Sequence, residues 1–273
     1  MNIEYVLILK IIVSVGVVLV LSYIAEAVSS KWAGIISGLP TGSAIMLYFY
    51  AFENGKIFAS ESALYNMIGL VAMQSFICGY YLSNKIIKRP GIVFSTIIGL
   101  LLYFLAAILI SFVNVTQTTA LIVSPISFLI FIRLFKNIKV VDNKRKVTLT
   151  KKILFIRSLT SGLIIVIITT IANLIGSRWS GIFSAFPTTL YPLLVIIHKN
   201  YGKNLVDSVI KYVPQGLTGL LIYSYIIHVS YKSTGINYGM FLAFMGTFCY
   251  LLLFSLFENL RKKLLLKKML STS

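Results

Sequence analysis

Apolar stretches of about twenty residues follow one another along almost the whole chain, separated by short polar segments. The hydrocarbon core of a bilayer is about 30 Å thick, and a helix needs about twenty apolar residues to cross it. The pattern therefore predicts an all-α membrane protein with about nine transmembrane helices. Their expected ranges are 5–29, 32–52, 61–84, 91–113, 117–136, 154–176, 179–198, 206–230 and 234–258.

Composition agrees with this pattern. Of the 273 residues, 58% are hydrophobic and only 12% are charged, whereas about a quarter of the residues of a soluble domain are charged. The formal net charge of +18 could indicate a nucleic-acid binder. However, the basic residues lie in the loops and the tail, where cytoplasmic segments of membrane proteins carry them. We therefore expect membrane lipids, and no nucleic acid, among the partners.

One sequence motif occurs twice. The segment 31–41, KWAGIISGLPT, returns as 178–188, RWSGIFSAFPT, at an offset of 147 residues without a gap. Between 24–41 and 171–188, nine of the eighteen positions are identical. A repeat of this kind indicates that the chain consists of two related halves.

The only long polar stretch inside the chain, 137–152, separates the two copies. We assign 1–136 to the first repeat plus a crossover helix, 137–152 to a cytoplasmic linker, 153–260 to the second repeat and 261–273 to a basic cytoplasmic tail. Five expected spans precede the linker and four follow it. An odd number of crossings brings the second copy into the membrane from the opposite side, so the two repeats are expected to be inverted.

The distribution of basic residues predicts the orientation. With the N-terminus outside and the C-terminus in the cytoplasm, 21 of the 25 Lys and Arg residues lie on the cytoplasmic side. Only Lys10, Lys56, Arg178 and Lys232 are then left on the outer side. Because cytoplasmic loops carry the excess of Lys and Arg, we expect a multi-pass protein of the cytoplasmic (inner) membrane in this orientation.

Each half resembles the small four-helix GlpM-type membrane proteins. The resemblance rests on an apolar span, a Gly-x-x-x-x-x-Pro-Thr stretch that opens the second span, and a glycine-bearing third span. It covers roughly 10–85 and 157–230. It implies that the chain is a fusion of two such units, although the second copy and the fifth span depart from that pattern. No mechanism is carried over from the resemblance.

Pro40 and Pro187 interrupt apolar segments at matching positions of the two copies. A proline inside a helix removes a backbone hydrogen bond and clashes with the preceding turn. One interpretation is a tolerated kink that shapes packing. The other interpretation is that the second and the seventh helix are each broken or kinked at the proline. The second half of each helix would then start at the proline and face a cavity, as in inverted-repeat transporters. In that case the amides of residues 41–43 and 188–189 would be free helix-start donors able to attract anions.

Small, hydroxyl and ionisable residues surround these positions. Close helix packing alone could explain the small ones. Among the ionisable ones, Glu26 could pair with Lys31 near the interface, and the long basic side chains of Lys10 and Arg157 could extend to the lipid headgroups. The candidate substrate-binding residues are Gly34, Ser37, Pro40, Thr41, Ser43, Gly181, Ser184, Pro187, Thr188, Thr189, Glu26, Asn173, Lys10 and Arg157.

No motif for enzyme chemistry is found. His198 and His228 have no carboxylate or cysteine at metal-ligand spacing, and no nucleophile motif or phosphate-binding loop occurs, so we expect no catalytic residues, metal or cofactor. The expected function is a secondary transporter or lipid-type flippase that moves a small anionic or polar solute by alternating access. The alternative is a non-transporting membrane factor that binds or assembles partner membrane proteins. A homodimer, the substrate and any coupling ion stay open.

Overall fold

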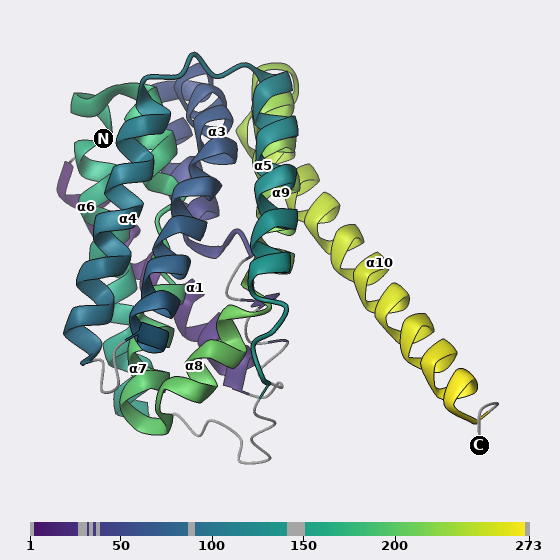
Figure 1. Cartoon of the computed structure of the whole chain (residues 1–273). Coiled ribbons are helices and arrows are strands. Elements are labelled where there is room, and N and C mark those ends of the chain that lie inside the picture. The colour runs from purple at the N-terminus through teal and green to yellow at the C-terminus, as the bar shows by residue number, and fades with distance from the viewer. Residues whose placement is uncertain are drawn as a thin grey trace.

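The computed structural model describes residues 3–26, 32, 35–36, 39–86, 91–140 and 151–270. Within these ranges the regular structure is helical throughout, without strands. The helices are α1 (Ile3–Glu26), α3 (Thr41–Ile86), α4 (Ile92–Ser111), α5 (Gln117–Leu134), α6 (Lys151–Ser184), α7 (Leu190–Tyr201), α8 (Lys203–Ile210), α9 (Val213–Thr234) and α10 (Ile236–Leu270) (Figure 1).

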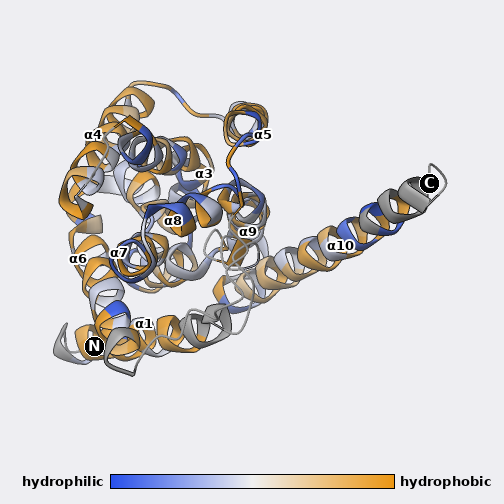
Figure 2. Cartoon of the chain, turned by 60° about the horizontal axis from the view of Figure 1, so that its bottom comes forward, coloured by the Kyte–Doolittle hydropathy of each residue, from blue (hydrophilic) through white to orange (hydrophobic). Residues whose placement is uncertain are grey.

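Five of the described helices are long and apolar enough to cross a membrane. They are α3, α4, α5, α6 and α10. Large hydrophobic side chains are exposed along α1, α4, α6 and α10, and Figure 2 shows these helices largely in the colour of apolar residues. Soluble proteins rarely expose an apolar surface of this extent, whereas the hydrocarbon core of a bilayer accommodates it. The molecule is therefore a helical membrane protein.

The chain turns at two glycines that lie between expected spans. The expected spans 32–52 and 61–84 share the long helix α3, which turns at Gly55 with φ 88°. The expected span 206–230 is divided between α8 and α9, and α8 follows directly on Gly202, whose φ is 81°. Only glycine adopts such positive φ values without strain. Gly55 and Gly202 are 147 residues apart, so both copies turn at the same place in the repeat.

The second half also departs from the expected spans. Helix α6 leaves helical geometry at Gly176, where φ is 75°, which is where the expected span 154–176 ends. Its last part then stops at Ser184, inside the expected span 179–198. Because α6 begins at Lys151, the last two residues of the expected linker are helical, and 141–150 lie outside the described residues. Helix α10 extends to Leu270, so the basic tail begins within a helix.

Helix α3 lies at the centre of the bundle and packs against α4, α6 and α9. Helix α1 packs mainly on α6, and α5 contacts α3 and α9. Helix α10 packs on α9 and then slants away from the other helices (Figures 1 and 2). Most side chains of α3 are buried, because neighbours surround this helix on several sides.

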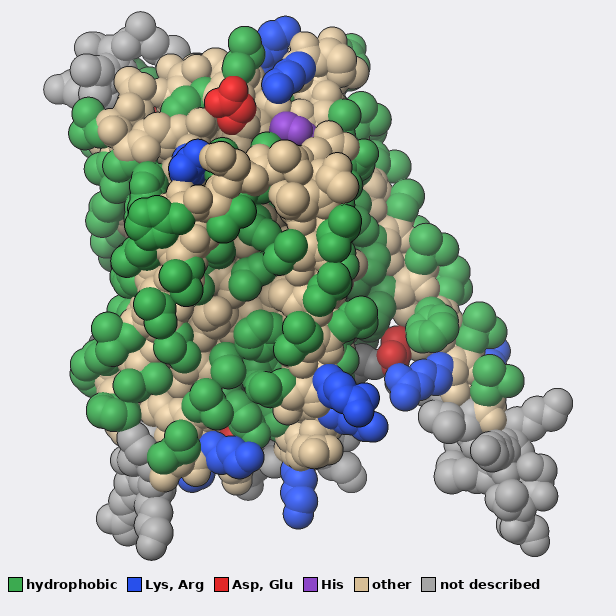
Figure 3. Space-filling view, turned by 45° about the horizontal axis from the view of Figure 1, so that its top comes forward, with side chains coloured by type: hydrophobic (Ala, Val, Ile, Leu, Met, Phe, Trp, Pro, Cys, Tyr) green, Lys and Arg blue, Asp and Glu red, His purple; other side chains and the backbone are tan. Residues whose placement is uncertain are grey.

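Figure 3 shows hydrophobic side chains over the middle of the molecule and Lys and Arg side chains at its two ends. This distribution is typical of a protein whose middle lies in a bilayer. Lys10 and Arg157 are exceptions, since each is only 3% exposed. Both side chains are therefore held inside the protein.

Candidate functional site

The two Pro-Thr segments, one from each copy, are in direct contact. The side-chain hydroxyls of Thr41 and Thr189 lie 2.9 Å apart and share a hydrogen bond. Beside them, the Ser43 hydroxyl donates to the carbonyl oxygen of Ser184 at 2.6 Å. A Cβ atom on Gly42 would collide with the Thr188 hydroxyl, so the two segments approach as closely as a glycine allows.

The two Pro-Thr segments share backbone hydrogen bonds at equivalent residues, although α7 begins two residues later in its copy than α3 does. Helix α3 begins directly after Pro40, and Pro187 lies between the end of α6 at Ser184 and the start of α7 at Leu190. Three backbone hydrogen bonds occur in both copies at equivalent residues. In the first copy they run from Leu39 N to Ile36 O (3.1 Å), from Thr41 N to Leu39 O (2.7 Å) and from Ala44 N to Pro40 O (3.0 Å). In the second copy they run from Phe186 N to Phe183 O (3.0 Å), from Thr188 N to Phe186 O (2.7 Å) and from Tyr191 N to Pro187 O (2.8 Å).

These hydrogen bonds correct one expectation. The amides of Thr41 and Thr188 are not free helix-start donors, because each donates to the carbonyl oxygen two residues earlier. The short turn at each proline uses these amides locally. The site therefore has less capacity to bind an anion through backbone amides than the sequence suggested.

The end of α6 exposes backbone carbonyls, which other side chains satisfy. A helix leaves its last four carbonyl oxygens without intrahelical partners, and water is absent from a bilayer core to replace them. Here Ser184 donates to Gly181 O (2.7 Å), Ser43 to Ser184 O (2.6 Å) and Tyr103 to Ile182 O (2.9 Å), which also accepts from the Ala185 amide (3.1 Å). Tyr50 donates to Ser180 O (3.1 Å), just before these four carbonyls. Partners from α3, α4 and α6 itself thus stabilise the interruption.

Arg157 lies at the same interruption. Its Nη2 atom donates to the carbonyl oxygen of Thr189 at 3.3 Å, and the Ser161 hydroxyl, one turn further along α6, donates to the carbonyl oxygen of Thr188 at 2.8 Å. The expectation that Arg157 extends to the headgroups is wrong, because its side chain is directed into the protein. A positive charge is thereby placed beside the contact between the two copies.

Asn66 joins three helices around the Pro-Thr contact. Its Nδ2 atom donates to the Ser184 hydroxyl, and its Oδ1 atom accepts from the Ser224 hydroxyl, both at 2.7 Å. It therefore connects α3 with α6 and α9. Polar side chains inside a membrane protein commonly form such bridges, although Asn66 was not among the candidate site residues.

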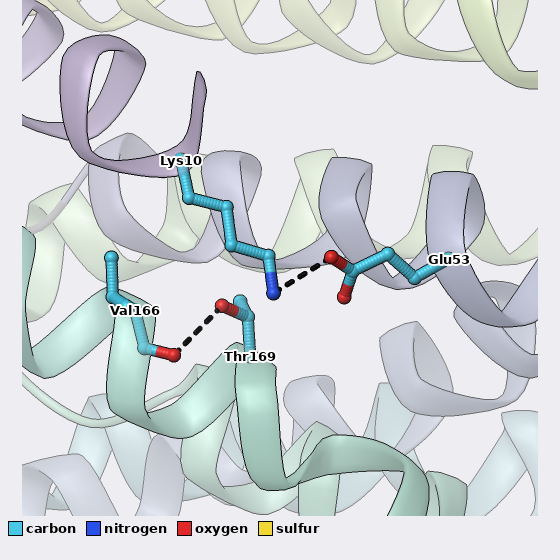
Figure 4. Close-up of polar contacts among 4 residues, drawn as sticks. All are labelled: Lys10, Glu53, Val166 and Thr169. Atoms are coloured by element: carbon cyan, nitrogen blue, oxygen red, sulfur yellow. Dashed lines mark hydrogen bonds and ion pairs between the residues drawn. The ribbon is translucent and has the colours of Figure 1, made fainter. Parts of the chain in front are cut away.

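Lys10 belongs to a second polar group (Figure 4). Its Nζ atom lies 2.8 Å from Oε1 of Glu53, and 5.8 Å from the ring centre of Phe49. The Lys10 side chain is 4% exposed and that of Glu53 is 24% exposed. The headgroup interpretation is thus wrong for Lys10 as well. Glu53 was not among the predicted site residues, because it follows directly on the expected end of a span at 52. An embedded lysine such as Lys10 needs an opposite charge nearby, and this need could have pointed to Glu53.

The ion pair lines a cavity of about 500 Å³, a size typical of ligand-binding pockets. The Thr169 hydroxyl, which also lines it, donates to the carbonyl oxygen of Val166 at 3.1 Å (Figure 4). Asn173, the counterpart of Glu26 in the second copy, is part of the same wall. Its polar lining is Lys10 from α1, Glu53 and Asn54 from α3, and Thr169, Thr170 and Asn173 from α6.

A second cavity of about 570 Å³ is almost entirely apolar. It is a groove between α1, the first part of α3 and α10. Pro40 and Thr41 form one end of the α3 wall and Phe49 lies near the other. The groove therefore leads from the Pro-Thr contact towards the ion pair.

The structure brings most of the predicted site residues together at the Pro-Thr contact. Gly181 packs against the backbone of Ser62 in α3, where no side chain would fit. The residues at or next to the contact are Pro40, Thr41, Ser43, Arg157, Gly181, Ser184, Pro187, Thr188 and Thr189, whereas Lys10 and Asn173 line the polar cavity. Gly34, Ser37 and the side chain of Glu26 lie outside the described residues.

Among the residues that the structure describes, no group of three or more His, Cys, Asp or Glu side chains could hold a metal ion. Comparison of the chain with models of protein families, with curated proteins and with solved structures found no match. The resemblance to GlpM-type proteins stays a prediction. Fold and composition define a helical membrane protein with two polar sites in its interior.

Proposed function

We propose that the protein is a secondary transporter or lipid-type flippase that moves a small anionic or polar substrate by alternating access. The observation that carries this proposal is the contact between Thr41 and Thr189. It joins equivalent proline interruptions of two copies at one place. Binding sites of many transporters are built in this way, from discontinuous helices at the interface of two repeats.

Two observations support an inverted relation between the copies. The equivalent hydrogen bonds and turns indicate that the two halves share one local structure. In Figure 1, the connection from α4 to α5 and the turn from α9 to α10 lie at the same end of the bundle. The 147-residue offset places α4 and α10 at equivalent positions of the two copies. Since α4 ends at this end of the bundle and α10 begins there, the two helices run in opposite directions. Opposite directions of counterpart helices are what an inverted repeat requires.

Alternating access requires two states that differ by only a few kcal/mol. The contact between the copies suits this requirement, since a hydrogen bond between neutral hydroxyls contributes only about 1 kcal/mol net. Contacts with a bound substrate could replace it. The proline interruptions supply the points at which one half can tilt against the other while each half keeps its internal hydrogen bonds.

The charges at the two sites restrict the substrate. Glu53 offsets the charge of Lys10, so the interior is less positive than the sequence indicated. Arg157 still places a positive charge next to Thr189. A polar or anionic substrate fits a site that carries a positive charge at this place.

The test is transport by the purified protein in reconstituted vesicles with two probes in parallel. One probe is phosphatidylethanolamine with a fluorescent nitrobenzoxadiazole label, whose movement between leaflets is followed by quenching with dithionite. The other is radiolabelled inorganic phosphate as a small anion. We expect movement of at least one probe above that in protein-free vesicles. Rates equal to those of protein-free vesicles for both probes would contradict the proposal.

The alternative function, a non-transporting factor that assembles partner membrane proteins, is favoured by one feature. Helix α10 slants away from the bundle and exposes apolar side chains such as Phe241, Leu253 and Leu256. Such a surface could receive another membrane helix. The double variant Leu253→Ser and Leu256→Ser changes this surface outside both cavities and separates the two functions, because only partner assembly should depend on it.

A further inference from the structure

The polar cavity and the apolar groove lie end to end along the same pair of helices. On α1, Lys10 lines the cavity and Val13 and Val17 line the groove. On α3, Glu53 lines the cavity and Phe49, one turn away, lines the groove. The ammonium group of Lys10 lies 5.8 Å from the Phe49 ring centre, so these two residues form the boundary between a charged compartment and an apolar one.

The length of this combined surface matches one leaflet of a bilayer. Glu53 and Thr41 mark its two ends on α3, and a helix rises about 1.5 Å per residue, which gives about 18 Å between them. Half of the hydrocarbon core is about 15 Å thick. A ligand that fills both compartments would therefore have its polar end near the membrane surface and its apolar end near the bilayer middle.

The charges of the polar compartment specify the polar end. Lys10 and Glu53 contribute one positive and one negative charge at 2.8 Å, and the remaining polar lining consists of neutral amides and hydroxyls. A zwitterionic headgroup could exchange partners with this ion pair, its phosphate with Lys10 and its ammonium with Glu53. A headgroup with a net negative charge would meet the Glu53 carboxylate without a cation of its own.

We propose that the cavity of Lys10 and Glu53 and the groove of Val17 and Phe49 form a single binding site for a zwitterionic phospholipid. Its headgroup lies at the ion pair and an acyl chain lies along the groove towards Pro40. The leaflet is the one at the N-terminal end of α1, which is the outer leaflet in the orientation proposed above. This inference rests on the proposed transport function and names the substrate class of its site.

Lipid binding to the full-length protein tests the site separately from transport. The purified protein is exchanged into mixed micelles with phosphatidylethanolamine or phosphatidylglycerol of identical acyl chains, and retained lipid is measured by native mass spectrometry. We expect the zwitterionic lipid to be retained about tenfold over the anionic one, as one charge-assisted contact would provide. Equal retention of the two lipids would overturn the inference.

Two kinds of variant make the test specific. Glu53→Gln removes the partner of the ammonium and leaves Lys10, so the preference should shift towards phosphatidylglycerol. Val17→Trp fills the groove without touching the ion pair and should abolish retention of phosphatidylethanolamine. Its matched control is Val20→Trp on the same helix, since Val20 is 61% exposed and lies outside both cavities. An unchanged preference in Glu53→Gln, or equal retention by the two tryptophan variants, would refute the site.

The headgroup alone provides a further discrimination. Glycerophosphoethanolamine, which has the headgroup but no acyl chains, should not displace the bound lipid at equimolar concentration. Displacement of the bound lipid by this headgroup would show that the groove contributes nothing to binding, and the inference would fail. Selective retention without any movement of labelled lipid in vesicles would instead support the binding site and contradict the transport function.

Discussion

The hydroxyl groups of Thr41 and Thr189 lie 2.9 Å apart, although the residues are separated by 148 positions in the chain. Thr41 opens α3 directly after Pro40, and Thr189 follows Pro187 at the start of α7. The two helix interruptions that the sequence repeats are thus held against each other. The functional proposal, the cross-link, the Gly42→Ala prediction and the final transport test depend on this contact.

The contact predicts a cross-link between the halves. In a chain with Cys78→Ala and Cys249→Ala, the pair Thr41→Cys and Thr189→Cys should form a disulfide on mild oxidation, because the replaced side-chain oxygens are within 3 Å of each other. A protease site inserted at position 143 allows the halves to be separated on a denaturing gel. They should stay joined until a reductant is added. The pair Thr41→Cys and Thr234→Cys, treated identically, should release two fragments, because the end of α9 lies beside Lys56 and not beside Thr41.

Gly42→Ala should destabilise the protein. An added Cβ would collide with the Thr188 hydroxyl, and overpacking of this kind costs about 1–3 kcal/mol. Thermal unfolding in detergent measures the effect. Gly16→Ala is the control, since nothing lies within 4 Å of that Cβ. Adding Thr188→Ala to Gly42→Ala should restore part of the lost stability, and a double variant as unstable as Gly42→Ala would contradict the close approach.

The ion pair of Lys10 and Glu53 predicts that removing the Glu53 carboxylate destabilises the protein more than removing the Glu61 carboxylate does. Glu53→Gln leaves Lys10 buried beside a neutral amide and should lower the unfolding free energy by about 1–3 kcal/mol, less than for a fully buried pair because Glu53 is partly exposed. Glu61→Gln is the matched control on the same helix, at an exposed residue whose carboxylate accepts from Ser177 at 3.0 Å. Similar unfolding temperatures for both variants would show that Lys10 does not need Glu53.

Replacing both Lys10 and Glu53 tests whether the loss in Glu53→Gln comes from the unpaired charge of Lys10. Lys10→Met together with Glu53→Leu removes both charges, and two apolar side chains of similar size can substitute for a buried ion pair at little cost. The double variant should therefore unfold at a higher temperature than Glu53→Gln alone. A lower temperature would indicate that Glu53 stabilises the protein through contacts other than the ion pair.

The orientation of the chain predicts the accessibility of two labels. In the cysteine-free background, Thr118→Cys should react from outside the cell with a maleimide that does not cross membranes. Asn143→Cys, which lies outside the described residues, should react only after permeabilisation. This follows from the basic residues assigned to the cytoplasmic side. Equal labelling of both positions from outside would refute the inverted arrangement of the halves.

The repeated motif singled out residues that meet at the Pro-Thr contact, although they were expected as a substrate site and not as a contact between the two segments. Thr41, Ser43, Ser184 and Thr189 were recognised because each lies beside a proline that interrupts an apolar segment in both copies. Residues that share an interruption in two related halves are natural candidates for the interface between them. That the two segments touch each other could not be read from their positions in the chain, since spacing says nothing about how two halves are docked.

The partners of the site were harder to predict. Tyr50 and Tyr103 donate to carbonyls of α6 that are 130 and 79 residues away, and in the sequence they are ordinary aromatic residues of apolar spans. Glu53 was missed because the expected span ended one residue before it. The turns at Gly55 and Gly176 fall where expected spans end or between them. The expected spans 32–52 and 179–198, in contrast, run across the proline segments, where α3 begins at Thr41, α6 ends at Ser184 and α7 begins at Leu190.

Transport with and without the cross-link tests the central proposal most directly. Vesicles contain the Thr41→Cys and Thr189→Cys variant, and dithionite quenching follows the movement of labelled phosphatidylethanolamine. Because alternating access requires the two interruptions to separate, we predict movement in the reduced protein, its loss on oxidation and its recovery on reduction. Movement at the same rate in the oxidised and the reduced protein, or none in either, would contradict the account.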